Sequence, residues 1–246
     1  MFWFLRLWLA HLIADFPLQT NLIFRLKKKS IFGVFIHGTV FLILALFLSI
    51  PYLKYFISWI YIILVWLFHI WIDWEKIKVS NTSKERDNVW YFVLDQILHL
   101  ISLIFVFFIP ISRYPQLWEN PNLGKIWIRF YNSDYFILLS IGYILVVFAG
   151  TVFTFYVRKS FSGKEEFIKL GIPTKEKYSE GFFKSILFLI FWFNIKNLYI
   201  ILLIILFIKF LSDKYILKLS YKSYFLNTMV DIVILTIVIS LLKLLL

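Results

Sequence analysis

Cysteine is absent from this chain of 246 residues. Its absence excludes disulfide bonds, thiolate metal ligands and cysteine nucleophiles, so any chemistry must use nitrogen and oxygen groups. Charged residues are also scarce, at 16%, while 61% of the residues are hydrophobic and the mean hydropathy is +0.84. Soluble domains carry about 25% charged residues. The composition therefore predicts an integral membrane protein.

Several familiar catalytic motifs are missing as well. The chain has no glycine-rich phosphate loop, no G-x-S-x-G nucleophile elbow and no H-E-x-x-H zinc motif. The net charge of +12 would suit nucleic acid, but the basic residues are spread through connections between apolar segments. We therefore interpret them as anchors against an anionic lipid surface, and we expect the lipid bilayer and no nucleic acid as a partner.

Apolar segments close to the ~20 residues that a crossing helix needs follow one another along the chain. A first apolar helix at 2–16 should end or kink at Pro17, because proline lacks the backbone N–H. Further segments cover 31–50, 52–74, 89–109, 135–157 and 225–246, whereas 181–211 reads as one tilted span or two shorter pieces. The polar stretch 158–184 reads as a loop with one surface helix.

The sequence thus predicts an all-α, polytopic transmembrane helix bundle of about six to eight spans. We expect residues 1–110 to form a four-helix membrane core and residues 111–246 to add further transmembrane helices to the same membrane domain. Connections after the first, third and fifth segments carry fifteen Lys and Arg, against four after the second and fourth. The positive-inside rule then places the N-terminus outside, in a multi-pass protein of the cell inner (cytoplasmic) membrane.

All four histidines lie in the first half of the chain, each within an apolar segment. Three of them stand four residues from an aspartate, in the pairs His11/Asp15, His69/Asp73 and Asp95/His99, and His37 stands alone. Residues four apart share one face of a helix. An aspartate at the centre of a membrane helix costs roughly 2.5–3.5 kcal/mol, so such side chains normally face a partner, a cavity or an ion.

These polar residues should lie at a similar depth in the membrane. At a rise of about 1.5 Å per residue, Asp15, His37, His69 and Asp95 lie roughly 10–15 Å from the charged residues that we take as the cytoplasmic ends of their segments. Helical bundles build metal sites from such inward side chains, and His and Asp suit Zn, Mn, Fe or Co. We predict a divalent metal ion held by His11, Asp15, His37, His69, Asp73, Asp95 and His99.

Three further residues would support this site. Gln19 and Gln96 would supply hydrogen bonds around the ligands, and Gly38, directly after His37, would leave room for a neighbouring helix or a ligand. A structural interpretation stays open beside the metal site. A single His/Asp pair can be a hydrogen-bonded pair that fixes a helix seam, and a lone histidine such as His37 can be structural. Asp213 and Asp231 lack histidine neighbours and read as a cap or a local polar contact.

The motifs H-x3-D-x3-Q at His11, HG at His37, H-x3-D at His69 and DQ-x2-H at Asp95 resemble DUF3307, an uncharacterised bacterial integral-membrane family. The resemblance covers about the first 110 residues. It implies a short polytopic membrane protein. It also singles out nine polar residues: His11, Asp15, Gln19, His37, His69, Asp73, Asp95, Gln96 and His99. It implies no activity.

We interpret the site as that of a metal-dependent membrane hydrolase acting at the cytoplasmic face. A metal ion would lower the pKa of a bound water towards ~7, and Asp15 or Asp95 would act as the catalytic general base. A lipid-borne ester, phosphoester or amide, or a membrane-delivered peptide, would be the substrate. A metal-ion or proton carrier is the first alternative, although no polar route leads outward from the cluster. A structural or accessory membrane subunit is the second.

Overall fold

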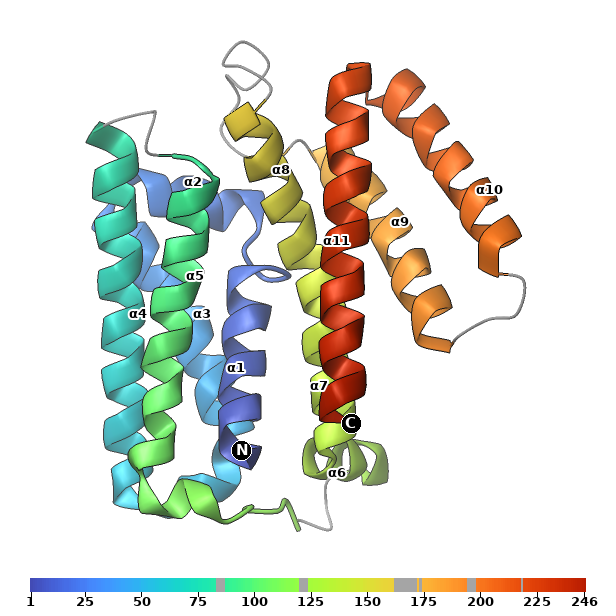
Figure 1. Ribbon diagram of the computed structural model, residues 1–246. Helices are drawn as coiled ribbons and strands as arrows, with labels where there is room; N and C mark the ends of the chain where they lie inside the picture. The colour runs from blue at the N-terminus through green and yellow to red at the C-terminus, as the bar shows by residue number, and fades with distance from the viewer. Residues whose placement is uncertain (83–86, 120–123, 162–171, 173, 194–197, 218) are drawn as a thin grey trace. The chain divides into compact units, whose positions relative to one another are not determined.

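A computed structural model describes residues 1–82, 87–119, 124–161, 172, 174–193, 198–217 and 219–246 (Figure 1). These residues form helices and connections, and no strand occurs among them. Five described helices are long and apolar enough to cross a membrane: α3 (Ile31–Leu48), α4 (Phe56–Thr82), α5 with the 3₁₀ turn η3 (Val89–Phe108), α7 to α8 (Asp134–Phe161) and α11 (Tyr221–Leu245). The prediction of an all-α transmembrane bundle is confirmed.

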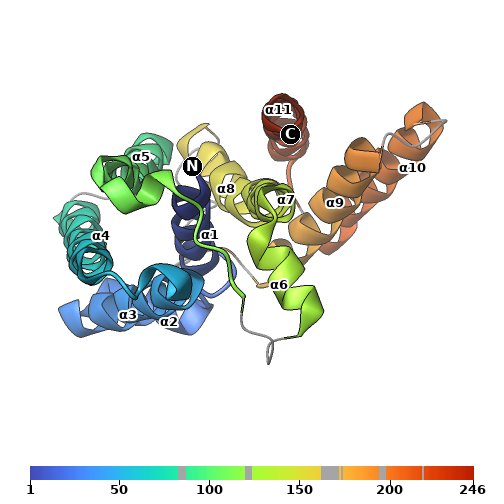
Figure 2. The same ribbon diagram turned by 90° about the horizontal axis from the view of Figure 1, so that it is seen from below.

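The chain divides into two compact units, Met1–Ile141 and Gly142–Leu246. In the first unit, α1 (Phe2–Asp15) packs against α3 and α5, and α4 packs against the same two helices. The four helices α1, α3, α4 and α5 therefore form a closed ring, which Figure 2 shows end-on. With 14 residues, α1 is shorter than the other three, and it ends two residues before Pro17, as the sequence predicts.

A short amphipathic helix, α2 (Asn21–Lys29), lies crosswise to these helices at one end of the ring (Figure 1). The Thr20 hydroxyl accepts a hydrogen bond from the Ile23 N–H and caps its start. Gly33 makes the close packing of α2 on α3 possible, because a Cβ there would lie 2.0 Å from the Leu26 carbonyl oxygen. The tight corner places one face of α2 over the end of the bundle.

The opposite end of the first unit is closed by aromatic residues and by Arg6. The Trp3 and Tyr52 rings stack at 4.4 Å, and the Tyr52 hydroxyl donates to the Tyr114 carbonyl at 3.2 Å. Burial raises the pKa of Tyr52, in the short 3₁₀ helix η1 (Ile50–Tyr52), to about 12. Arg6 binds the Tyr131 carbonyl of α6 (Lys125–Asn132) and the Asp134 carboxylate of α7 (Asp134–Ile144). A second 3₁₀ turn, η4 (Pro110–Arg113), follows η3 (Phe105–Phe108).

The second unit contains α8 (Gly150–Phe161), α9 (Thr174–Phe193), α10 (Leu198–Leu211) and α11 (Tyr221–Leu245). A π turn at η5 (Leu145–Ala149) leads from α7 into α8, and another at η7 (Ser212–Ile216) follows α10. Helix α11 packs against both α8 and α9, and α10 packs against α9. The stretch 181–211 therefore forms two helices instead of one tilted span.

The interpretation of 158–184 as a polar loop is wrong at both of its ends. Helix α8 continues to Phe161, and α9 begins at Thr174, with Arg158, Glu176, Glu180 and Lys184 all buried. Charged side chains that neutralise one another can be buried in a helix, so their presence did not mark a loop. The middle of this stretch, 162–171 and 173, lies outside the described residues.

Candidate functional site

The predicted polar residues come together inside the ring of α1, α3, α4 and α5. Helix α1 supplies His11 and Asp15, α3 supplies His37, α4 supplies His69 and Asp73, and α5 supplies Asp95 and His99. All seven side chains belong to residues with 7% or less of their surface exposed. Each i, i+4 pair faces the interior because the remaining faces of these helices carry apolar side chains. We call these seven residues the His/Asp cluster.

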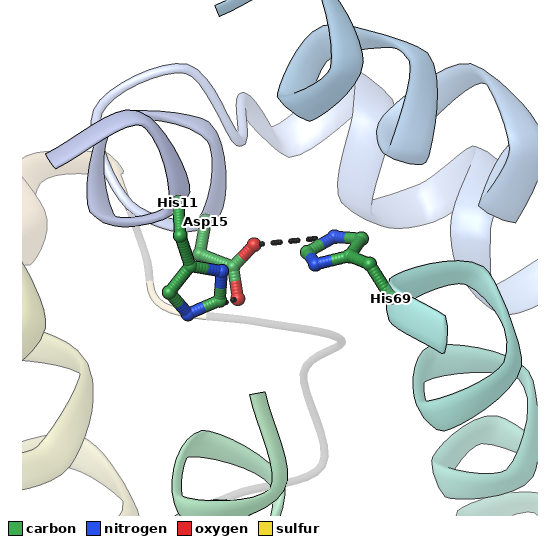
Figure 3. Close-up of side chains that lie close together, drawn as sticks. All are labelled: His11, Asp15 and His69. Atoms are coloured by element: carbon green, nitrogen blue, oxygen red, sulfur yellow. Dashed lines mark ion pairs between the residues drawn. The ribbon is translucent and has the colours of Figure 1, made fainter. Parts of the chain in front are cut away.

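Asp15 lies among the imidazoles of three helices. Its Oδ1 atom is 3.1 Å from His37 Nε2 and 3.6 Å from His69 Nε2, and its Oδ2 atom is 3.8 Å from His11 Nε2. Figure 3 shows the carboxylate on α1 facing the His69 ring on α4, with His11 on the same helix as Asp15. One carboxylate thus links three histidines that are up to 58 residues apart in the sequence.

Two imidazole nitrogens lie close to two carboxylates. The Nε2 atoms of His37 and His69 lie 3.1 and 3.6 Å from Asp15 Oδ1, and both lie 3.5 Å from Asp73 Oδ2. Only the shortest of these four distances falls within the usual 2.7–3.2 Å of an N–H···O hydrogen bond. Metal–ligand bonds of about 2.0–2.2 Å place neighbouring tetrahedral ligands roughly 3.3–3.6 Å apart. Among these residues, His37, His69 and Asp73 each place one ligand atom within 4.8 Å of the others, which is the arrangement that one ion would need.

His99 is held in a form that suits a ligand. Its Nδ1 atom lies 2.8 Å from the Asp95 carbonyl oxygen, and a carbonyl can only accept, so Nδ1 carries the proton. The Nε2 atom then has a free electron pair, and among the described residues it finds no hydrogen-bond partner. The ring centroid lies 4.4 Å from that of His69 and 4.9 Å from that of His11. Fixing one ring nitrogen through a backbone carbonyl is the usual way in which metal-binding histidines are oriented.

Two lysines complete the site, and sequence reasoning missed both. Lys27 Nζ on α2 lies 2.6 Å from Asp73 Oδ1, and Lys76 Nζ on α4 lies 2.6 Å from Asp95 Oδ2. Neither lysine stood out in the sequence, and α4 continues past Lys76 to Thr82. The amphipathic pattern of α2 could have indicated that one of its basic residues faces inward.

The supporting residues contact the cluster from α5 and from the connection after α1. Gln96 Nε2 lies 3.3 Å from Asp15 Oδ2 and 3.0 Å from Asp95 Oδ2, and the Gln19 amide lies 3.4 Å from His37 Nε2. Gly38 has a different role, because a Cβ there would lie 2.5 Å from the Ile70 side chain. It allows α3 to approach α4 closely, which brings His37 towards His69.

Three overlapping groups of residues place their ligand atoms within 4.8 Å of one another: His11, Asp15 and His69; His37, His69 and Asp73; and Asp15, Asp95 and His99. Together they include all seven predicted ligands. Asp213 and Asp231 lie in the second unit and take no part in these groups.

Comparisons with curated proteins and with solved structures found no match. A family comparison did find one, and it covers the whole His/Asp cluster together with Lys27 and Lys76. The resemblance that the four motifs indicate is confirmed: residues 3–122 match the family described as "Protein of unknown function (DUF3307)".

Proposed function

We propose that the His/Asp cluster binds a divalent metal ion and that the protein is a metal-dependent hydrolase of the membrane. The observation that supports the metal most directly is the set of four N···O distances, 3.1 to 3.6 Å, between two imidazoles and two carboxylates from three helices. Neighbouring ligands of a tetrahedral ion have such spacings, and three protein ligands such as His37, His69 and Asp73 would leave the fourth position open for a water or a substrate. The donor set of imidazole nitrogen and carboxylate oxygen suits Zn, Mn, Fe or Co.

The charge balance of the cluster also favours a bound cation. Lys27 neutralises Asp73 and Lys76 neutralises Asp95, but the partners recorded for Asp15 are imidazoles and the amide of Gln96. A buried carboxylate without a compensating positive charge is costly in a membrane protein. A divalent ion beside Asp15 would supply that charge without protonating a histidine.

The two lysine-paired aspartates suggest different roles. Asp73 would be a ligand through Oδ2, while its Oδ1 atom stays paired with Lys27. Asp95 belongs to a different group, with Asp15 and His99, and its Oδ2 atom binds both Lys76 and Gln96. A metal ion in this site would polarise a substrate carbonyl or phosphoryl oxygen and activate a water. Asp95 would accept the proton of that water as the general base.

The surroundings favour a hydrolase over a carrier. One helical turn beyond the imidazoles, in the direction of Leu48, the helices present Leu7, Phe41, Val65 and Leu103, all buried and apolar. On the other side Lys76 and Gln96 are only partly buried. Partial exposure on one side of the cluster suits a substrate that would enter and leave by the same route, such as a lipid-borne ester, phosphoester or amide. A carrier needs an opening on both sides.

Metal analysis of the detergent-purified protein tests the first part of this proposal. We expect at least one Zn, Mn, Fe or Co ion per chain in the wild type, and a loss of at least tenfold in affinity in His37→Ala and Asp73→Asn. Tyr143→Phe is a matched control, because Tyr143 belongs to the second unit, contacts Ser185 there and is not one of the proposed ligands. Folded wild-type protein that takes up none of these ions would contradict the metal site.

The hydrolase is tested separately with Asp95→Asn. This change keeps the shape of the side chain and removes its basicity, so we expect metal to stay bound while the hydrolysis of lipid ester, phosphoester and amide probes falls by about 10²–10⁴-fold. Equal probe hydrolysis by the two proteins would remove Asp95 from the mechanism. Metal transport into vesicles by the wild type, without hydrolysis, would favour the carrier.

A further inference from the structure

The second unit contains its own buried group of charges. It is built by α8, α9, α10, η7 and α11. Its members are at most 4% exposed: Thr154, Glu180, Lys184, Lys209, Asp213, Asn227 and Asp231. We call these seven residues the C-terminal ion cluster. The role of this cluster is independent of the metal-dependent hydrolase proposed above.

Two lysines hold the C-terminal ion cluster together. Lys184 Nζ lies 2.8 Å from Glu180 Oε2 and 2.8 Å from Asp231 Oδ1. Lys209 Nζ lies 2.6 Å from Glu180 Oε1, with Asp213 Oδ2 at 3.3 Å and Asp231 Oδ2 at 3.7 Å. Three carboxylates therefore share two ammonium groups, and the cluster has one more negative than positive charge.

Within the part of the chain that the structure describes, the neighbouring charges do not correct this imbalance. Arg158 on α8 pairs with Glu176 on α9, and the pair is neutral as a whole. Lys214, which follows Asp213 directly, is exposed and contacts the rings of Tyr215 and Tyr221. The excess negative charge stays within the buried cluster.

Asp213 is the least stabilised of the three carboxylates. Glu180 receives both lysines and the Asn227 amide at 3.2 Å. Asp231 receives Lys184 and the Thr154 hydroxyl, the latter at 3.0 Å, on its Oδ1 atom, while its Oδ2 atom has no hydrogen-bond partner among the described residues and lies 3.7 Å from Lys209 Nζ. Asp213 has the shared Lys209, and its Oδ1 atom finds no hydrogen-bond partner among the described residues. The Oδ1 atom of Asn227, whose amide donates into the cluster, is likewise buried without a partner there.

The location makes an unbalanced charge expensive. Asp231 is ten residues from the start of the candidate span α11, which corresponds to about 15 Å along the helix axis. Ionisable residues at such depth are normally paired or form part of an ion or proton pathway.

We propose that the C-terminal ion cluster is a proton-binding site, and that its exchangeable proton resides on Asp213. Protonation removes the excess negative charge and gives the Asp213 carboxyl group a donor. The acceptor oxygen of Asn227 lies in the same cluster. Release of the proton leaves three carboxylates around two lysines, so binding and release depend on the two ammonium groups.

Infrared spectroscopy of the purified full-length protein tests this proposal, because a protonated carboxyl group has a C=O stretching band that an ionised carboxylate lacks. In sodium-free buffer, between about pH 5 and 9, we expect a wild-type band that disappears as the pH rises. Asp213→Asn should lose this band. Lys209→Met should strengthen it and shift its disappearance to higher pH, since one ammonium then faces three carboxylates.

Glu75→Gln is the matched control, because Glu75 is an exposed carboxylate paired with Lys78 and should leave the band unchanged. The two cluster variants move the band in opposite directions, so the test survives if one of them fails to fold. A band that is the same in the wild type and in both cluster variants would overturn the proposal. Loss of the wild-type band on adding sodium chloride at constant pH would also overturn it, because Na⁺ would then be the ligand.

Discussion

At the scale of single residues, the pairing of Lys27 with Asp73 explains how a carboxylate is kept charged inside the first unit. The lysine side chain is 9% exposed and the aspartate is completely buried. Removing one partner of a buried ion pair leaves the other charge uncompensated, whereas removing both does not. The pair therefore orients Asp73 for the site and also ties α2 to α4.

Lys27→Met should lower the free energy of unfolding by about 3–5 kcal/mol, because it leaves Asp73 unpaired. The double variant Lys27→Met/Asp73→Asn should recover most of this loss. Denaturant unfolding in micelles with a chelator present measures the difference, because the chelator removes any contribution of bound metal. If the double variant is as unstable as the single one, the pair does not hold α2 in place.

Tyr52 gives a pH-dependent prediction outside the candidate spans. Its hydroxyl binds the Tyr114 carbonyl and the Gln116 N–H, so Tyr52→Phe should cost about 0.5–1.5 kcal/mol near neutral pH. The pKa of Tyr52 is raised to about 12 in the folded protein by burial. Its ordinary value is about 10, so the stabilisation is complete below pH 10 and is lost as the pH rises towards 12.

Thermal unfolding of the wild type and Tyr52→Phe, compared from neutral pH upward, measures this effect. The wild type should lose its advantage over the variant above about pH 10, because only the wild type has a phenol to ionise. The comparison cancels the titration of lysines, which both proteins share. A constant difference across this range would show that the Tyr52 phenol ionises normally.

At the scale of helices, the corner between α2 and α3 decides whether Lys27 can reach the bundle. Gly33 lies in the first turn of α3, directly against the backbone of α2. Backbone atoms cannot move aside as a flexible side chain does, so this position requires glycine for reasons of space. Gly38 has a similar role farther along α3, where it faces Ile70 on α4.

Gly33→Ala should destabilise the first unit by at least about 1–3 kcal/mol and should weaken the contact of Lys27 with Asp73. Gly124→Ala is the matched control, since a Cβ at Gly124 meets no described atom within 4 Å. Unfolding free energies of both variants and protease sensitivity of the α2 corner are the measurements. Equal stability of the two variants would contradict the tight corner.

At the scale of the whole molecule, the protein consists of two units with separate polar interiors. The first encloses the His/Asp cluster and the second encloses the C-terminal ion cluster. Each interior is largely neutralised by its own lysines, two in each unit. We therefore expect the metal ion and the proton that we propose to bind independently of each other.

Metal binding should stabilise the wild type by about 2.7 kcal/mol at a free metal concentration 100 times the Kd, and a chelator should reverse this gain. Asp213→Asn should bind metal and show the same stabilisation as the wild type, while His37→Ala should show none. Thermal shift assays across a metal titration measure these differences. If Asp213→Asn also lost the metal-dependent stabilisation, the two clusters would not be independent.

The sequence by itself determined the membrane class, the helical architecture and the identity of the seven residues of the His/Asp cluster. Hydrophobic length defines a crossing helix locally, and the i, i+4 spacing of His and Asp places each pair on one helix face. The location of the end of α1 before Pro17 follows from the backbone chemistry of proline alone.

Only the tertiary structure decided which charges neutralise one another. Lys27 lies 46 residues from Asp73, and Lys184 lies 47 residues from Asp231, so no local pattern links either pair. From the sequence, Lys76 and Lys184 were interpreted as basic residues of the connections between spans. A sequence does not show whether water or a carboxylate surrounds a lysine. The free energy of a buried charge depends on its partners in space, and packing brings those partners together.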